Sequence, residues 1–317
     1  MDKDVVPADR KATRSVSQPL DALQKMVKTP AGRAHMLERI DGFVTYTEGT
    51  RESVEKARSF IRDGYVPVLY ANHQSHADKL VLSGITQSLA QRDAHDRFAG
   101  FLVPVAATIE SGEQGSYIQQ LMSLFAPLYF DRGYGPDVSF ITDSDRQTRG
   151  VTGSNTASVK RLMDAPRDKY GLVMFPEATL KGGRTGDGGT VNGMQDVTPI
   201  TGGGLIGYPR FWVNRGLGEA VFLPIGISGS YRMYPPDSDR NEISPRVIMG
   251  ILGDRPVEPM VTISAGNPFS YSDLRDEVRE EPNNKQKKHI DLMMSKVAEL
   301  LPATERGNYR NYEPKIT

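Results

Sequence analysis

Apolar runs alternate with helix-like patterns along the middle of the chain. Four runs predict buried strands, because they are short, apolar and bounded by polar or turn-forming residues: 66–70, 98–105, 170–175 and 220–228. Between them, apolar residues recur every three or four positions and predict helices at 79–92, 116–127, 154–162 and 204–212. Strands that alternate with helices are typical of an α/β fold with a mainly parallel sheet.

The N-terminal part of the chain follows a purely helical pattern. Residues 1–17 are polar and mixed in charge, which predicts a flexible start. From residue 19 to residue 63 the apolar positions have helical spacing, and Pro30 ends the first helix. We therefore predict an N-terminal helical region, residues 1–63, that packs on the main domain.

The C-terminal part supplies further predicted elements of the main domain. Residues 246–252 and 261–265 are apolar enough for strands, and residues 284–301 carry one apolar stripe at helical spacing. We therefore predict that residues 64–317 form one α/β domain, a mainly parallel mixed sheet flanked by helices.

A polar turn, residues 71–78, joins the first predicted strand to the helix that follows it. Such junctions are common places for active sites in open α/β sheets. His73 and Asp78 are separated by four residues across the bend, so the carboxylate can fold back onto the imidazole. That pairing fixes one tautomer and leaves the other ring nitrogen free to take a proton from a hydroxyl. We predict that His73 is a general base oriented by Asp78.

The same turn has two other interpretations. Its polar residues can cap the next helix. His73, His76 and Asp78 can also be metal ligands, because imidazole and carboxylate together suit zinc or iron. Their spacing misses the His-x-His-x-Asp-His pattern of metallo-β-lactamase-like hydrolases by one residue, so we expect no metal here. Ser75 lies in no Gly-x-Ser-x-Gly elbow, which argues against a serine nucleophile.

Two later strands also end in charged residues. Arg132 follows a short predicted strand at 127–130, and its guanidinium fork suits bidentate binding of phosphate, unless it pairs with neighbouring Asp131. Glu177 follows the strand at 170–175, which delivers a carboxylate beside the turn. We expect Glu177 to be an orienting hydrogen-bond acceptor.

A glycine-rich segment lies between the third and fourth strands, residues 182–204. It lacks the Gly-Lys-Ser/Thr ending of a phosphate-binding P-loop. We predict a mobile loop over the site that closes on substrate.

Four segments resemble, in order, the motif blocks of the glycerolipid acyltransferase family, whose members acylate glycerol-3-phosphate and lysophosphatidate. The first is Asn72-His73-x4-Asp78, and the second is a strand followed by Arg132. The third is similar to Phe-Pro-Glu-Gly-Thr-Arg at Phe175, Pro176, Glu177 and Thr179, with Ala178 in place of the glycine. The fourth is similar to Val-Pro-x-x-Ile at residues 223–227. The resemblance spans about half of the chain.

The resemblance assigns roles to individual residues. It implies that His73 and Asp78 are catalytic and that Arg132 holds the phosphate of the acceptor. It also implies that Glu177 and Thr179 contact substrate. The wall of the acyl-donor site would be formed by Pro224 and Ile225.

One departure affects the acceptor. Leu180 stands where the family has a phosphate-binding arginine. Lys181 or Arg184 can supply that charge from the adjoining loop, or the acceptor differs.

The implied fold is the α/β fold of glycerol-3-phosphate acyltransferases, and the implied reaction is direct acyl transfer. The donor is the thioester of acyl-CoA or acyl-carrier protein, and the acceptor is a hydroxyl of glycerol-3-phosphate or a lysophospholipid. The reaction belongs to phospholipid biosynthesis and needs no cofactor besides the donor. Two other functions stay open, a metal-dependent hydrolase and a non-catalytic lipid-binding relative.

Composition narrows the partners and the location. Lys plus Arg and Asp plus Glu both number 39, and this balance argues against a nucleic-acid binder. The absence of cysteine excludes a thiol nucleophile and a thiolate metal site. The longest nearly apolar run, 98–109, is about half the length of a bilayer-spanning helix, and the N-terminus lacks an apolar signal core. We expect a cytoplasmic protein that touches the inner face of a membrane at most peripherally.

Overall fold

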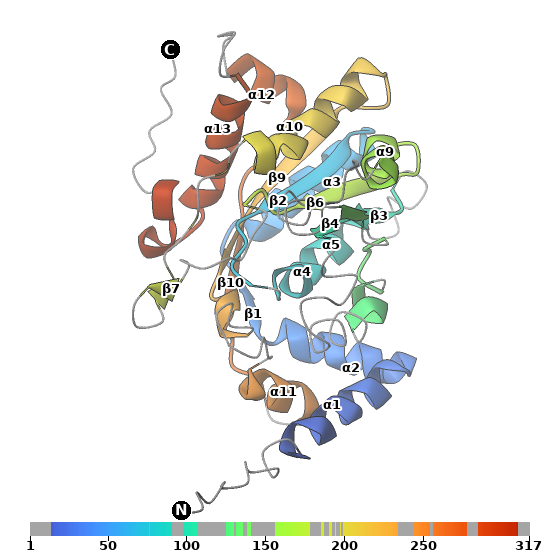
Figure 1. Cartoon of the computed structure of the whole chain (residues 1–317), viewed down its shortest axis with the longest axis vertical. Coiled ribbons are helices and arrows are strands. Elements are labelled where there is room, and N and C mark those ends of the chain that lie inside the picture. The colour runs from blue at the N-terminus through green and yellow to red at the C-terminus, as the bar shows by residue number, and fades with distance from the viewer. Residues whose placement is uncertain are drawn as a thin grey trace, which may run out of the picture.

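The computed structural model describes most of the 317 residues (Figure 1). The described residues are 14–75, 77–90, 98–106, 125–129, 131–135, 138–140, 156–177, 185–186, 190–191, 194, 197, 199–233, 244–253, 256–277 and 285–309. Most of the helix expected at 116–127 lies outside them, and so does much of the loop expected at 182–204.

A seven-stranded mixed sheet forms the centre of the protein, in the order β1-β10-β9-β2-β6-β3, with β11 also paired to β9. Four neighbouring strands run parallel to one another: β9 (Ala220–Ser228), β2 (Val66–Ala71), β6 (Tyr170–Met174) and β3 (Gly100–Leu102). Three further strands run the opposite way: β10 (Val261–Ala265), β11 (Phe269–Ser270) and β1 (Val44–Tyr46). The predicted α/β fold with a mainly parallel mixed sheet is confirmed.

The central strands are apolar along their whole length because both faces of the sheet are covered. Every residue of β2 is buried, and so is every residue of β9 except Ser228. Pro224 lies inside β9 where the strand changes partner, since Ile225 pairs with β10 and Phe222 pairs with β11. A proline lacks the N–H that a ladder needs, and such a break in pairing is a position that tolerates it.

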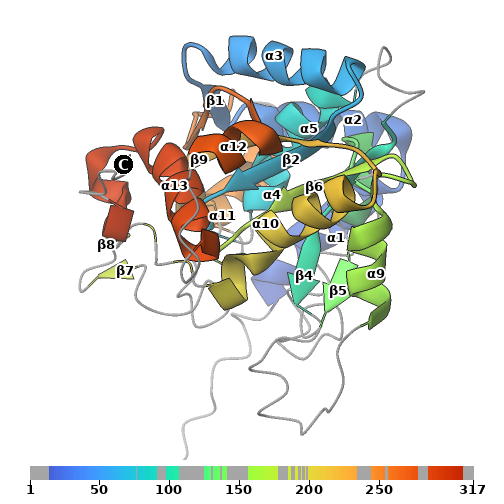
Figure 2. The same cartoon turned by 90° about the horizontal axis from the view of Figure 1, so that it is seen from above.

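Helices cover the two faces of the sheet (Figure 2). One face carries α3 (Thr50–Arg62), α4 (Asp78–Val81) and α5 (Ser83–Leu89); α1 (Arg14–Val27), α2 (Pro30–Asp41) and α11 (Pro245–Leu252) lie together beyond them. The other face carries α9 (Thr156–Asp164), α10 (Pro199–Asn214), α12 (Tyr271–Glu277) and α13 (Lys285–Glu299). Within β2, Leu69 belongs to the first core and Tyr70 to the second, as the alternation of side chains in a strand requires.

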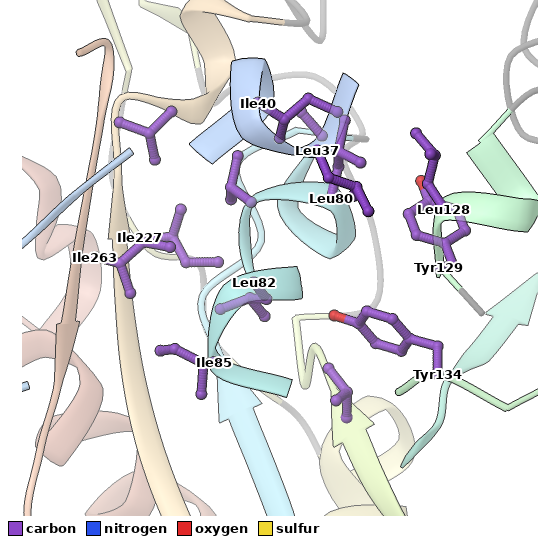
Figure 3. Close-up of a cluster of buried hydrophobic side chains, with 14 of the residues drawn as sticks. Leu37, Ile40, Leu80, Leu82, Ile85, Leu128, Tyr129, Tyr134, Ile227 and Ile263 are labelled. Atoms are coloured by element: carbon purple, nitrogen blue, oxygen red, sulfur yellow. The ribbon is translucent and has the colours of Figure 1, made fainter. Parts of the chain in front are cut away.

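The first core surrounds α4 and α5 (Figure 3). Leu82 and Ile85 lie between Ile227 and Ile263 of the sheet and the aromatic residues Tyr129 and Tyr134. All of these side chains are buried. The helices that follow β2 are therefore fixed against the sheet directly beside the turn that begins at Asn72.

Short elements complete the fold. β4 (Pro104–Ala106) pairs in parallel with β5 (Val138–Phe140), and β7 (Thr185–Gly186) pairs with β8 (Thr190–Val191). Three 3₁₀ turns are η2 (Ser230–Arg232), η3 (Ala303–Glu305) and η4 (Gly307–Tyr309). Within the described part of the chain, every helix is too short or too polar to cross a lipid bilayer.

Within residues 14–63, the N-terminal region contains three helices and one strand that the helical spacing did not predict. Thr29 caps α2 by accepting the N–H of Gly32, and Pro30 is its first residue, so the chain changes direction there. β1 then pairs with β10 at the edge of the sheet. Residues 44–46 are therefore part of the main sheet, which the division of the chain at residue 63 did not foresee.

Several predicted elements were wrong. The strand expected at 246–252 is helix α11, because Pro245 starts a helix and the buried residues Val247, Ile248 and Ile251 follow helical spacing. The strand expected at 127–130 is also helical as far as residue 129. Residues 202–204, expected in a loop, lie inside α10.

Two predicted elements are divided in the structure. The strand expected at 98–105 becomes β3 and β4, which belong to different sheets and are separated at Val103. The helix expected at 79–92 becomes α4 and α5, separated at Leu82. The helix at 154–162, the strand at 261–265 and the C-terminal helix are confirmed within two residues as α9, β10 and α13.

Candidate active site

Two neighbouring parallel strands send the chain to opposite faces of the sheet. β2 continues into α4 and α5 on one face, whereas the next long helix after its neighbour β6 is α10, on the other face. In open α/β sheets, ligands bind outside the carboxyl ends of strands at such a switch in topology. His73 lies two residues beyond β2 and Glu177 lies three residues beyond β6, so both stand at that position.

The turn after β2 is folded around the carboxylate of Asp78, the first residue of α4, which has no solvent exposure. Its Oδ2 is 2.7 Å from Nδ1 of His73 and accepts the backbone N–H groups of Gln74 (2.7 Å) and Ser75 (3.0 Å). A buried carboxylate needs hydrogen bonds in place of the water it has lost. The side chain of Asp78 therefore fixes both the shape of the turn and the orientation of the histidine ring.

The other carboxylate oxygen of Asp78 binds a residue that follows β9, the strand next to β2. Oδ1 of Asp78 accepts the hydroxyl of Ser230, which lies in η2 just after β9. Ser230 is fully buried. In the sequence, the only signal for Ser230 is its place two residues after the fourth predicted strand.

The hydroxyl of Ser75 makes its hydrogen bonds inside the turn. Its hydroxyl is 3.1 Å from the carbonyl oxygen of Ser230 and 3.5 Å from Oδ1 of Asp78, and it accepts the N–H of Ala77. The residue has no solvent exposure. These contacts occupy the hydroxyl inside the turn, in agreement with the argument against a serine nucleophile.

The ring of His73 is fixed in one orientation. Because a carboxylate oxygen only accepts, Nδ1 carries the hydrogen, and in the neutral ring Nε2 carries the lone pair. Nε2 has no hydrogen-bond partner among the residues that the structure describes. The ring stacks on Phe175 with centroids 4.7 Å apart, and 18% of the side chain is exposed. An oriented, partly exposed imidazole of this kind can accept a proton.

Glu177 contacts the same turn from β6. Its Oε1 accepts the backbone N–H of His73 at 2.9 Å, and only 3% of the residue is exposed. This contact ties the ends of β2 and β6 together. The placement agrees with an orienting acceptor, although here the group that it orients is the protein's own turn.

Asn72 joins the turn to β9. Its side-chain nitrogen donates to the carbonyl oxygen of Ile227, and its side-chain oxygen accepts the N–H of the same residue, both at 2.8 Å. The amide thus continues the pairing of β2 with β9 beyond the last backbone pair, Ala71 with Ile225. The backbone at His73 is therefore held to β9 through Asn72 and to the end of β6 through Glu177.

Arg132 is buried and already has partners. Its Nη1 donates to Oε1 of Gln87 (2.6 Å) and its Nη2 donates to Oδ2 of Asp41 (2.5 Å), while Asp131 pairs with Arg33 instead. Only 5% of Arg132 is exposed, and Nε has no partner within the described part of the chain. Its described hydrogen bonds do not reach the His73 turn, so its role as a phosphate ligand stays a prediction.

Tyr46 completes this charged cluster. Although 42% of the residue is exposed, its hydroxyl lies close to Gly84, where an added Cβ would be 2.2 Å away. Burial, assisted by the negative charge of Asp41 and opposed by the positive charge of Arg132, raises the pKa of Tyr46 to about 12. The phenol is therefore neutral at neutral pH and adds no charge to the cluster.

The remaining predicted residues fall into two groups. Pro224 and Ile225 are buried in β9 beside Tyr70 and Ala71 of β2, and Ile225 is part of the first core. Their role in donor binding stays a prediction. Outside the described residues lie Thr179, Lys181 and Arg184.

No metal-binding group is visible within the described residues, where no three histidine, aspartate or glutamate side chains gather in a way that could hold an ion. His76, one of the three ligands considered above, lies outside them. No family model and no curated protein sequence matches the chain. The function of the site is therefore inferred from its geometry and from the motif resemblance.

Proposed function

We propose that the protein is an O-acyltransferase of the glycerolipid type. It moves a fatty acyl group from acyl-CoA or acyl-carrier protein to a hydroxyl of glycerol-3-phosphate or a lysophospholipid. The observation that carries the proposal is the 2.7 Å pair of His73 and Asp78 at the carboxyl end of β2, with Nε2 of the ring lacking a described partner. The resemblance of four motif blocks supplies the substrate class.

In the proposed reaction, Nε2 of His73 takes the proton of the acceptor hydroxyl as its oxygen attacks the thioester carbonyl. A C–O bond forms, the C–S bond breaks, and the departing thiolate receives the proton from His73. Asp78 stabilises the imidazolium that forms in between, and the stacked ring of Phe175 limits rotation of the imidazole. General-base assistance contributes about 10²- to 10⁴-fold, and positioning of the two substrates must supply much of the remainder.

The acceptor phosphate is assigned to the basic residues. Arg132 would bind it by exchanging Asp41 or Gln87 for phosphate oxygens, which suit its guanidinium fork equally well. Lys181 or Arg184 would supply the charge that Leu180 lacks. Glu177 and Thr179 would contact substrate, and Pro224 with Ile225 would border the acyl donor. We place the enzyme in the cytoplasm, in peripheral contact with a membrane.

The test measures release of free thiol from palmitoyl-CoA and palmitoyl-carrier protein, each with glycerol-3-phosphate, with lysophosphatidate or with neither. Wild type is compared with His73→Gln and with the control His35→Gln, which changes a histidine on α2. We expect release that requires one acceptor, disappears in His73→Gln and persists in His35→Gln.

Other outcomes identify other functions. Release without an acceptor would indicate a thioesterase. No release with any pair, together with equal binding of phospholipid vesicles by wild type and His73→Gln, would indicate a non-catalytic lipid-binding protein. Activity that follows bound zinc or iron would indicate a metal-dependent hydrolase.

A further inference from the structure

Glu305, near the C-terminus, contacts the turn that carries His73. It ends η3, and both of its carboxylate oxygens are occupied. Oε2 accepts the side-chain N–H of Gln74 at 2.7 Å, and Oε1 accepts the hydroxyl of Ser228 at 2.8 Å. One carboxylate thus joins the turn after β2 to the end of β9.

Gln74 connects Glu305 to Asp78. It is 3% exposed, and its side-chain oxygen accepts the N–H of Gly229 at 3.0 Å, so the amide can point its nitrogen only toward Glu305. Its backbone N–H donates to Oδ2 of Asp78, the same oxygen that holds Nδ1 of His73. A shift of the backbone at Gln74, which its side-chain contacts oppose, would therefore withdraw one of the donors that fix the carboxylate and the ring.

Glu305 itself is held by the backbone around it. Its N–H and C=O are fixed through Pro302 and Met194, since Glu305 donates to the Pro302 carbonyl (2.8 Å) and accepts from Met194 (3.1 Å). Gly307 adopts φ +52, and an added Cβ there would lie 2.0 Å from the carbonyl oxygen of Met194. The carboxylate is therefore presented to Gln74 from a fixed backbone and not from a free chain end.

We propose that Glu305 is a positioning residue that acts through Gln74 on the turn holding His73 and Asp78. The inference rests on the proposed function, because the residue is given a role in the same site. A hydrogen-bond acceptor is needed at this position because the buried Gln74 amide faces it with its NH₂ group.

The contact can be tested by removing the acceptor and by reversing the polarity of the pair. Glu305→Leu removes the acceptor, and Gln74 cannot turn without setting its NH₂ against the N–H of Gly229. In Gln74→Glu, two carboxylates face each other. In the double variant Gln74→Glu/Glu305→Gln, every donor again meets an acceptor. The new amide at position 305 donates to the new carboxylate at position 74 and accepts from Ser228, while that carboxylate also accepts from Gly229. The control is Glu299→Leu, which removes a carboxylate at an exposed position on α13.

Two readouts are measured in all five proteins. The first is kcat and KM of acyl transfer, and the second is the imidazole N–H signal of His73 in a ¹H–¹⁵N spectrum, identified by its loss in His73→Gln. We expect each single variant at position 305 or 74 to lower kcat by about 10- to 100-fold, with little change in the KM of the donor or of the acceptor. We expect the double variant to recover kcat to within about threefold of wild type. The His73 signal should shift in both single variants and return in the double variant.

The inference is overturned if Glu305→Leu keeps the kcat and the His73 signal of wild type, or if the double variant is no better than Gln74→Glu. Should the single variants fail to fold, the double variant alone decides by the same two readouts. If wild type transfers no acyl group to any acceptor, the proposed function fails, whereas the His73 signal still tests the positioning role without substrate.

Discussion

Asp78 depends on the residues that donate hydrogen bonds to it, Gln74, Ser75 and Ser230, because all four are buried and cannot bind water instead. The carboxylate has no exposure and accepts hydrogen bonds from the turn on one oxygen and from Ser230 on the other. Two of the donors are backbone N–H groups, which only a substitution by proline removes. In the proposed reaction the charge of Asp78 serves catalysis, whereas its acceptor oxygens stabilise the turn. Two substitutions can separate these two effects.

We expect Asp78→Asn to keep the fold and lose activity. The amide oxygen can take the place of Oδ2 and accept from His73, Gln74 and Ser75, while the NH₂ group faces the hydroxyl of Ser230. The neutral amide no longer stabilises an imidazolium, so kcat should fall by about 10²- to 10⁴-fold at nearly unchanged stability. Thiol release and urea unfolding measure the two effects.

Asp78→Ala should lose stability as well. It leaves the N–H groups of Gln74 and Ser75 and the Ser230 hydroxyl buried without an acceptor, which lowers the free energy of unfolding by about 2–4 kcal/mol. Equal stability of Asp78→Ala and Asp78→Asn would contradict this account of the turn.

Sequence spacing revealed the contacts made inside the turn but not those that reach it from elsewhere. His73 and Asp78 are five positions apart, so the bend after a strand was enough to predict that they pair. Ser230 is 152 positions from Asp78, and Glu305 is 231 positions from Gln74. Arg132 pairs with Asp41, 91 positions away, in place of its neighbour Asp131. Only the path of the chain through the sheet brings these residues together.

At the scale of elements, periodicity identified most helices and strands and was wrong where glycine or a short apolar run obscured it. α11 has eight residues, and a short apolar run of that length fits a strand as well as a buried helix. In α10, Gly202, Gly203 and Gly204 suggested a loop, yet the helix forms because Leu205 and Trp212 are fully buried in the second core. Packing outweighs the low helix propensity of glycine here.

The glycines of α10 are not equivalent, which gives a prediction. An added Cβ at Gly207 meets nothing within 4 Å, whereas one at Gly204 would be 2.8 Å from the ring of Tyr208 and 3.2 Å from Met174. We expect Gly207→Ala to raise the free energy of unfolding by about 0.4–1 kcal/mol, because alanine restricts the unfolded chain without a clash. Gly204→Ala, the matched variant, should lower it, and urea unfolding of both measures the difference. Equal effects of the two substitutions would contradict the packing that the structure assigns to Gly204.

At the scale of the whole molecule, the site depends on how closely the C-terminal helix approaches the sheet. α13 packs along β9 (Figure 1), and Gly226 of β9 lies against the turn that ends the helix. A Cβ on Gly226 would be 2.8 Å from Cβ of Leu300 and 3.2 Å from its carbonyl oxygen. Five residues after Leu300, Glu305 contacts Gln74. The absence of one side chain therefore allows the end of the chain to reach the turn of His73.

We expect Gly226→Ala to reduce both stability and activity, although residue 226 carries no catalytic group. The end of α13 has to move away from β9, which lowers the free energy of unfolding by about 1–3 kcal/mol as overpacking does elsewhere. The same movement draws Glu305 away from Gln74, so kcat should fall while KM changes little, in the manner of Glu305→Leu. Gly207→Ala is the control, because it adds the same methyl group on the same side of the sheet without a clash. If Gly226→Ala lost stability but kept the kcat of wild type, the close packing of α13 would serve the fold alone, and the C-terminal segment would have no part in holding the turn.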